Sequence, residues 1–91
     1  MKKEESLFIK LRSVLLKDWD PILVGENPNL SDEYDEYIEQ IIDLLNQGKR
    51  ENAIFEFLKY QETQLGLYVP SEQREIAVNK IIKEFKTILL P

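Results

Sequence analysis

The 91 residues of this chain include no histidine and no cysteine, and they carry a formal net charge of −5 at pH 7. Without those two residue types the chain lacks the commonest general base, the thiol nucleophile and the best metal ligands, so we expect no enzymatic activity and no cofactor. The negative charge opposes binding to nucleic acid, and no apolar run approaches the roughly 18 residues of a membrane span.

The first predicted element is an amphipathic helix over residues 4–17. Leu7, Phe8, Leu11, Val14 and Leu15 follow the spacing of one helical face. Lys3, Lys10 and Lys17 recur every seven residues and form a basic line that we expect to be solvated. Residues 18–30 then contain two prolines, a glycine and two asparagines, which predicts one longer loop.

Two interpretations are open for the tryptophan in this loop. Asp20 followed by Pro21 is typical of a helix N-cap with proline in the first turn, so a short helix is predicted there. Trp19 can then close the junction between the first two helices as a buried side chain. It can also be an exposed aromatic anchor within an acidic rim, since tryptophan is enriched at binding hot spots.

The second helix is predicted to begin near Ser31, with Asn29 or Ser31 as its cap and with acidic residues in its first turn. Gly48 supplies a stop signal at its end. Its apolar stripe predicts the side that faces the core: Tyr34, Tyr37, Ile38, Ile41, Ile42 and Leu45.

The third helix is predicted over residues 50–65, ending at Gly66, and the fourth begins with Ser71 as its cap. The short joint at 47–49 requires the second and third helices to be antiparallel. The inner faces are predicted to be Ala53, Ile54, Phe57, Leu58 and Leu65 in the third helix and Val78, Ile81, Ile82, Phe85 and Leu89 in the fourth. We therefore expect an all-α, compact four-helix bundle-like single domain over 1–91.

A one-sided charge block interrupts this pattern. From residue 18 to residue 43 there is no lysine or arginine, and there are nine carboxylates: Asp18, Asp20, Glu26, Asp32, Glu33, Asp35, Glu36, Glu39 and Asp43. Four of them form a line opposite the apolar stripe of the second helix: Asp32, Glu36, Glu39 and Asp43. Either lysines of the first or last helix neutralise this acidic line, or the line is a surface for a basic partner.

Paired acids also suggest a carboxylate site for a divalent metal. Glu33-x-x-Glu36, Glu36-x-x-Glu39 and Glu72-x-x-Glu75 are similar to the paired acids of all-helical nucleotide pyrophosphohydrolases. Most acids of the second helix are nevertheless predicted to point to solvent and not into a bundle core. A carboxylate-metal hydrolase is therefore the second alternative function.

Three motifs follow one another between residues 14 and 66: Trp19-Asp20-Pro21-Ile22, Asp32-Glu33-Tyr34-Asp35 and Leu44-Leu45-Asn46-Gln47-Gly48. With them the chain resembles a small bacterial family of unknown function found in Bacillus-type genomes. Many members have glycine directly after the Trp-Asp-Pro-Ile run, where this chain has Leu23. The resemblance implies an all-helical bacterial protein and brings no known activity.

A second resemblance rests on the predicted four-helix fold, the size and the acidic charge, which are similar to those of nuclease-colicin immunity proteins. Those proteins carry a Tyr-Tyr-Pro run in their binding region, where this chain has Leu67-Tyr68-Val69-Pro70 with one tyrosine and one proline. The resemblance implies an alternative function, the inhibition of a basic toxin or nuclease in the manner of an immunity protein or antitoxin.

The main hypothesis is a cytoplasmic, non-enzymatic module that binds a basic protein. An aromatic centre would supply binding energy, and the surrounding acids would steer and select the partner. The absence of cysteine fits a reducing compartment, and the N-terminus lacks a signal-peptide core. The candidate partner-binding residues are Asp18, Trp19, Asp20, Asp32, Glu33, Asp35, Glu36, Glu39 and Asp43.

Overall fold

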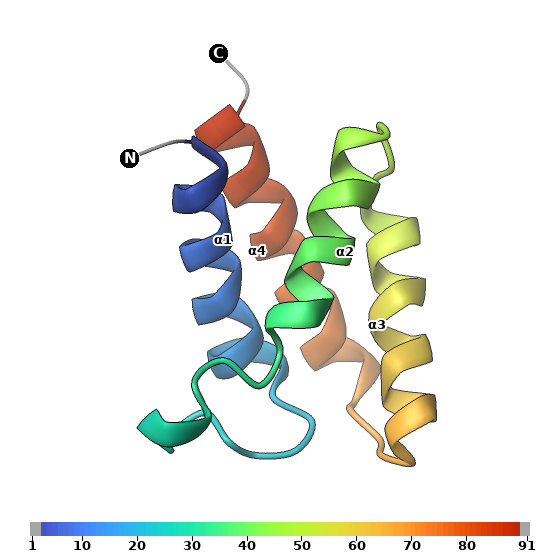
Figure 1. Ribbon diagram of the computed structural model, residues 1–91. Helices are drawn as coiled ribbons and strands as arrows, with labels where there is room; N and C mark the ends of the chain where they lie inside the picture. The colour runs from blue at the N-terminus through green and yellow to red at the C-terminus, as the bar shows by residue number, and fades with distance from the viewer. Residues whose placement is uncertain (1–2, 90–91) are drawn as a thin grey trace.

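The computed structural model describes residues 3–89 as four α-helices packed side by side (Figure 1). The helices are α1 (Lys3–Val14), α2 (Asp35–Asn46), α3 (Glu51–Leu65) and α4 (Ser71–Leu89). Contacts join α1 to α2, α2 to α3, α3 to α4 and α4 back to α1, so the four helices form a closed ring around one core. No strand occurs within residues 3–89, and the prediction of an all-α four-helix bundle is confirmed.

The core is built from one face of each helix. The predicted inner residues of α1 and α4 are buried, except that Phe8 is partly exposed and the side chain of Leu89 lies outside the described residues. In α3, Leu65 is 40% exposed and does not join the core as predicted, because it occupies the last helical position before Gly66. Gly66 has a φ of 70°, the left-handed conformation that ends helices at glycine.

The first helix continues beyond Val14 as a π-helical turn, η1 (Leu15–Trp19). This turn ends where the amide of Asp20 donates a hydrogen bond to the carbonyl of Leu15 over 2.7 Å. Asp20 itself has a left-handed φ of 37°. The sequence pattern predicted a plain helix to residue 17, and it contained no signal for the wider turn.

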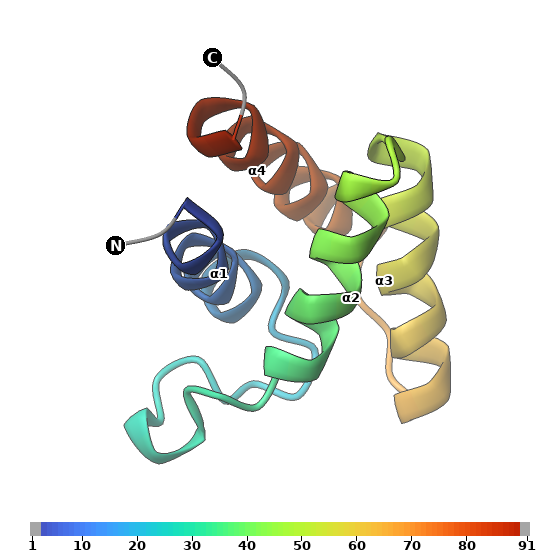
Figure 2. The same cartoon turned by 45° about the horizontal axis from the view of Figure 1, so that its top comes forward.

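The second helix begins four residues later than predicted. A 3₁₀ turn, η2 (Pro28–Leu30), is capped by the side chain of Asn27, and residues 31–34 form further turns before α2. Neither predicted cap is used, and the acids of the first turn of α2 are Asp35 and Glu36. Tyr34, directly before α2, is buried, and its hydroxyl accepts a hydrogen bond from the amide of Ile22 and donates one to Asp20. Figure 2 shows this long connection projecting from one end of the bundle.

Candidate functional site

Trp19 is not an exposed anchor, which corrects its assignment as a partner-binding residue. Its side chain is 0% exposed. The indole Nε1–H donates a hydrogen bond to the Glu62 carboxylate at 2.8 Å, and the ring lies 5.3 Å from Tyr34 and 5.8 Å from Tyr37 between centroids. The alternative interpretation is confirmed, in which Trp19 closes the junction between helices. The aromatic centre expected to bind a partner is part of the core.

Asp20 is also used within the fold, and its prediction as the N-cap of a short helix is wrong. One carboxylate oxygen accepts hydrogen bonds from the amide of Val24 at 2.8 Å and from the hydroxyl of Tyr34 at 2.7 Å. The other accepts from the amide of Gly25 at 2.9 Å. Asp20 therefore organises the turns that follow Trp19, and residues 21–27 form no helix.

The backbone is tightly packed where this loop meets η1. A Cβ atom on Gly25 would lie 2.4 Å from the carbonyl oxygen of Leu16, so only glycine fits without displacement. Leu23 has a left-handed φ of 57° and is 86% exposed. This is the position at which the family resemblance leads us to expect glycine.

Two further predicted binding residues form ion pairs within the bundle. Asp35 accepts a forked pair of hydrogen bonds from the Arg12 guanidinium, one of them 3.0 Å long. These bonds raise the pKa of Arg12, and the charge of Asp35 adds to the effect. Asp18 accepts a hydrogen bond from Lys80 of α4 at 3.0 Å. Both carboxylates are therefore paired with a cation within the bundle.

The acidic line is different. Asp32, Glu36, Glu39 and Asp43 are exposed, as is the neighbouring Glu33. None of the five belongs to an ion pair among the side chains of residues 5–88. Asp32 lies within electrostatic reach of Arg12, but it precedes α2, so Asp32 and Glu36 are not the like-charged helical pair that was predicted.

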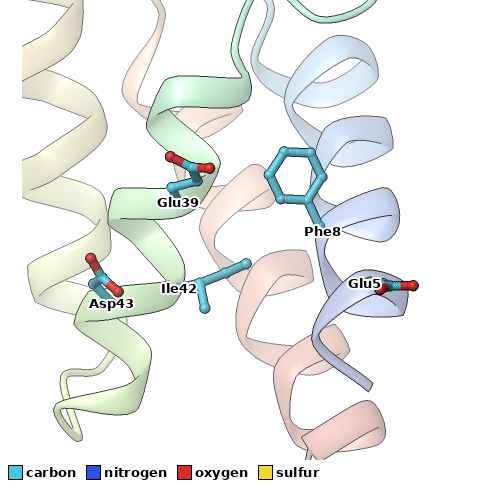
Figure 3. A pocket seen from close by; sticks show the side chains of 5 residues that line it. All are labelled: Glu5, Phe8, Glu39, Ile42 and Asp43. Atoms are coloured by element: carbon cyan, nitrogen blue, oxygen red, sulfur yellow. The ribbon is translucent and has the colours of Figure 1, made fainter. Parts of the chain in front are cut away.

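One end of this line borders a groove between α1 and α2, which we call the acidic groove (Figure 3). It has a volume of about 450 Å³ and is lined by Glu5, Phe8, Glu39, Ile42 and Asp43. Phe8 and Ile42 point into the gap from the two helices. Carboxylates are therefore combined with an apolar floor, and among the side chains of residues 5–88 no basic one lines the groove.

Only part of this groove could be predicted from the sequence. Glu39 and Asp43 were predicted as binding residues, whereas Glu5 was not, and Phe8 was assigned to the core. The available signal was the i, i+3 spacing of Glu5 and Phe8, which places both on one side of α1. Their position opposite Glu39 required knowledge of how α1 packs against α2.

A buried polar cluster also escaped prediction. Glu62 of α3 is 3% exposed and accepts hydrogen bonds from Trp19 and from the Arg74 guanidinium of α4, whose Nε lies 2.8 Å from the carboxylate. Arg74 also donates to the carbonyl of Val69 at 2.8 Å and lies over the ring of Phe55 at 4.9 Å. No buried side-chain nitrogen or oxygen in the described part of the chain lacks a hydrogen-bond partner.

Opposing influences set the pKa of Glu62. Burial is the largest and would raise it, but the hydrogen bonds from Arg74 and Trp19, with the charge of Arg74, outweigh burial and lower the pKa. The same hydrogen bonds raise the pKa of Arg74. The cluster is thus a fully ionised buried pair, and its geometry is that of a structural joint between η1, α3 and α4.

The described residues offer neither a metal site nor a membrane-spanning helix. No group of three or more acidic side chains among them is arranged to hold a metal ion. No helix within residues 3–89 has both the length and the apolar character that crossing a membrane requires.

The acidic groove combines charge with accessible apolar surface, and two of its carboxylates, Glu39 and Asp43, belong to the predicted binding residues. The resemblance to the Bacillus-type family stays a prediction. No family model matches the sequence, and no curated protein or solved structure matches it either.

Proposed function

We propose that this protein is a non-enzymatic, cytoplasmic binding module whose acidic groove binds a basic segment of another protein. The observation that carries the proposal is the pairing of unneutralised carboxylates with an apolar floor. Glu39 and Asp43 are exposed without an ion pair among the described side chains, and they flank the half-buried Phe8 and Ile42.

Lysine and arginine side chains match this combination. Their methylene groups can lie on Phe8 and Ile42 while the cationic head reaches a carboxylate. An exposed ion pair contributes about 0.2–1 kcal/mol, so charge alone gives weak binding and the apolar floor must add to it. The acids then act mainly by raising the rate at which the partner encounters the groove. This rate falls with added salt, because at 0.1 M salt charges more than about 10 Å apart are largely screened.

The stability of α2 gives no reason for Glu39 and Asp43 to be acidic. Glu39 and Asp43 are like-charged residues at i, i+4 on α2, an arrangement that costs about 0.2–0.5 kcal/mol. Asp43 also lies in the last turn of α2, where the helix dipole disfavours negative charge. A surface retained at a cost to local stability is expected where the surface serves binding.

The test is a pull-down from lysate of the parent cell at low and high salt. The groove variant Glu39→Lys/Asp43→Lys is compared with Glu72→Lys/Glu75→Lys, which makes the same change in net charge on α4. We expect the groove variant to lose the captured protein and the α4 variant to retain it, with capture by the unmodified protein weakening steeply as salt rises.

Stability measurements separate binding from a structural role. The two introduced lysines again form a like-charged i, i+4 pair, whereas a cation in the last turn of α2 suits the helix dipole, so the groove variant should match the unmodified protein in stability to within about a few tenths of a kcal/mol. A clear loss of stability in that variant would assign the acids to the fold. Equal capture by both variants would also contradict the proposal.

An inhibitor of a basic toxin or nuclease is the second candidate, and one observation favours it. Tyr68 is 80% exposed and Leu67 is 41% exposed, directly before α4. Tyrosine is enriched among binding hot spots, so this joint offers the aromatic anchor that Trp19 does not. Loss of capture by Tyr68→Ala, with capture retained by the groove variant, would favour this function and place the partner at the α3–α4 joint.

A further inference from the structure

A second hollow lies on the other side of α1, between α1, η1 and α4. Its volume is about 350 Å³, and four lysines line it: Lys10, Lys17, Lys80 and Lys83. Ser13 contributes a hydroxyl group and Val14 an apolar surface. We call it the lysine cleft. It uses a different face of α1 from the acidic groove, because residues 10 and 17 lie on the opposite side of the helix from residues 5 and 8.

The cleft has more positive than negative charge. Asp18 pairs with Lys80 at 3.0 Å, and Glu84 is the second acid in the lining. Four ammonium groups therefore face two carboxylates, in a chain whose net charge is −5. Lys80 and Lys83 are also like-charged neighbours at i, i+3 on α4, which destabilises a helix.

The wall of the cleft contains the π-helical turn. Lys17 and Asp18 belong to η1, the turn in which the first helix ends. Wider turns of this kind occur at the C-terminal ends of helices. The turn therefore places Lys17 and Asp18 beside Lys80 of α4 in the same cleft.

From these observations we infer that the lysine cleft binds a compact anion with two or more phosphate groups. Lysine recognises phosphate as a point charge, and the ligand can displace water from all four ammonium groups. Lys10 and Lys17 are seven residues apart, or about 10 Å along the helix axis, which suits a short chain of phosphates. A long nucleic acid would run beyond the cleft onto acidic surface and be repelled.

The probe for this inference is inorganic tripolyphosphate. Calorimetric titration is carried out at constant ionic strength, with the sodium salt replaced by sodium chloride in the reference. Removing one unit charge near a bound anion weakens binding about fivefold at high dielectric, so Lys10→Gln and Lys83→Gln should each raise the dissociation constant by about that factor.

Two further variants sharpen the test. Lys49→Gln/Lys59→Gln removes two exposed lysines outside the cleft and should leave binding within twofold of the unmodified protein. Asp18→Asn releases Lys80 and removes a negative charge, so it should tighten binding about fivefold. A folded structure for each variant is checked by its urea unfolding midpoint.

Three results would overturn the inference. The first is tripolyphosphate binding no stronger than that of chloride at equal ionic strength. The second is equal weakening by the control pair, which would show that binding follows net charge and not the cleft. The third is tighter binding of an oligonucleotide than of tripolyphosphate, which would assign the lysines to a polymer surface. None of these results depends on the acidic groove.

Discussion

Replacing Arg74 by methionine is expected to destabilise the protein more than any surface change. The substitution leaves Glu62 buried, with the Trp19 indole as its remaining side-chain donor. Removing one partner of a buried ion pair costs about 3–5 kcal/mol, because the other charge stays desolvated. The carbonyl of Val69 also loses its donor, which adds about 1 kcal/mol. The sum is comparable with the whole stability of a small domain, about 5–15 kcal/mol.

The pH dependence of stability should reverse in sign. In the unmodified protein the pKa of Glu62 is lowered relative to its unfolded value of about 4.3, so its stabilisation is present above that pH and is lost in acid. In Arg74→Met, burial without the guanidinium should raise the pKa of Glu62. The variant then loses stability as pH rises above about 4.3, because the folded state must hold a buried carboxylate.

The assay is urea unfolding followed by the fluorescence of Trp19, from about pH 4 to pH 7. A double variant, Glu62→Gln/Arg74→Met, removes both charges and keeps an oxygen acceptor for the indole. It should recover most of the lost stability, since replacing a buried pair by uncharged groups is often neutral. A double variant that loses as much stability as the two single changes added together would refute the reasoning. So would an Arg74→Met protein whose stability depends on pH in the same way as that of the unmodified chain.

Two further predictions concern the connection before α2. Leu23→Gly should raise the free energy of unfolding by roughly 0.5–1 kcal/mol, because the left-handed backbone costs a leucine more than the added chain entropy costs glycine. Leu23→Ala keeps the strained left-handed backbone, so its free energy of unfolding should not rise. The urea unfolding midpoints of the two variants test this, and a glycine variant less stable than the unmodified protein would contradict the prediction. Burial raises the pKa of Tyr34, and its hydrogen bond to Asp20 adds to this, so stability should fall as pH rises above about 10. Tyr34→Phe should reduce that fall without abolishing it, since burial also raises the pKa of Tyr37, and an unchanged alkaline decline in the unfolding curves would count against this assignment.

Helical periodicity was sufficient to predict the four helices and most of their inner faces. Positions such as Ile38, Ile41 and Leu45 of α2 recur at the helical spacing, and burial of that stripe is what holds the helix in the bundle. Gly66 marked the end of α3 because a left-handed residue there favours glycine. These signals are local, and local signals can be read from a sequence.

The details of the site depend on contacts between distant residues. Glu62 and Arg74 belong to helices whose many charges look alike in the sequence, and only packing shows that these two meet beneath the surface. The same holds for Asp20, which resembled a helix cap but accepts its hydrogen bonds from a loop and from Tyr34. The acidic line was predicted because exposure opposite an apolar stripe follows from geometry within one helix.

The position of Trp19 has a consequence for synthesis of the chain. Its indole donates a hydrogen bond to Glu62, which follows 43 residues later in the sequence. Its carbonyl accepts a hydrogen bond from Gln73, which follows 54 residues later. While Arg74 of a nascent chain is still inside the ribosome, Glu62 has no guanidinium partner. We therefore expect the first three helices to pack stably around the tryptophan only after the start of α4 has emerged from the ribosomal exit tunnel.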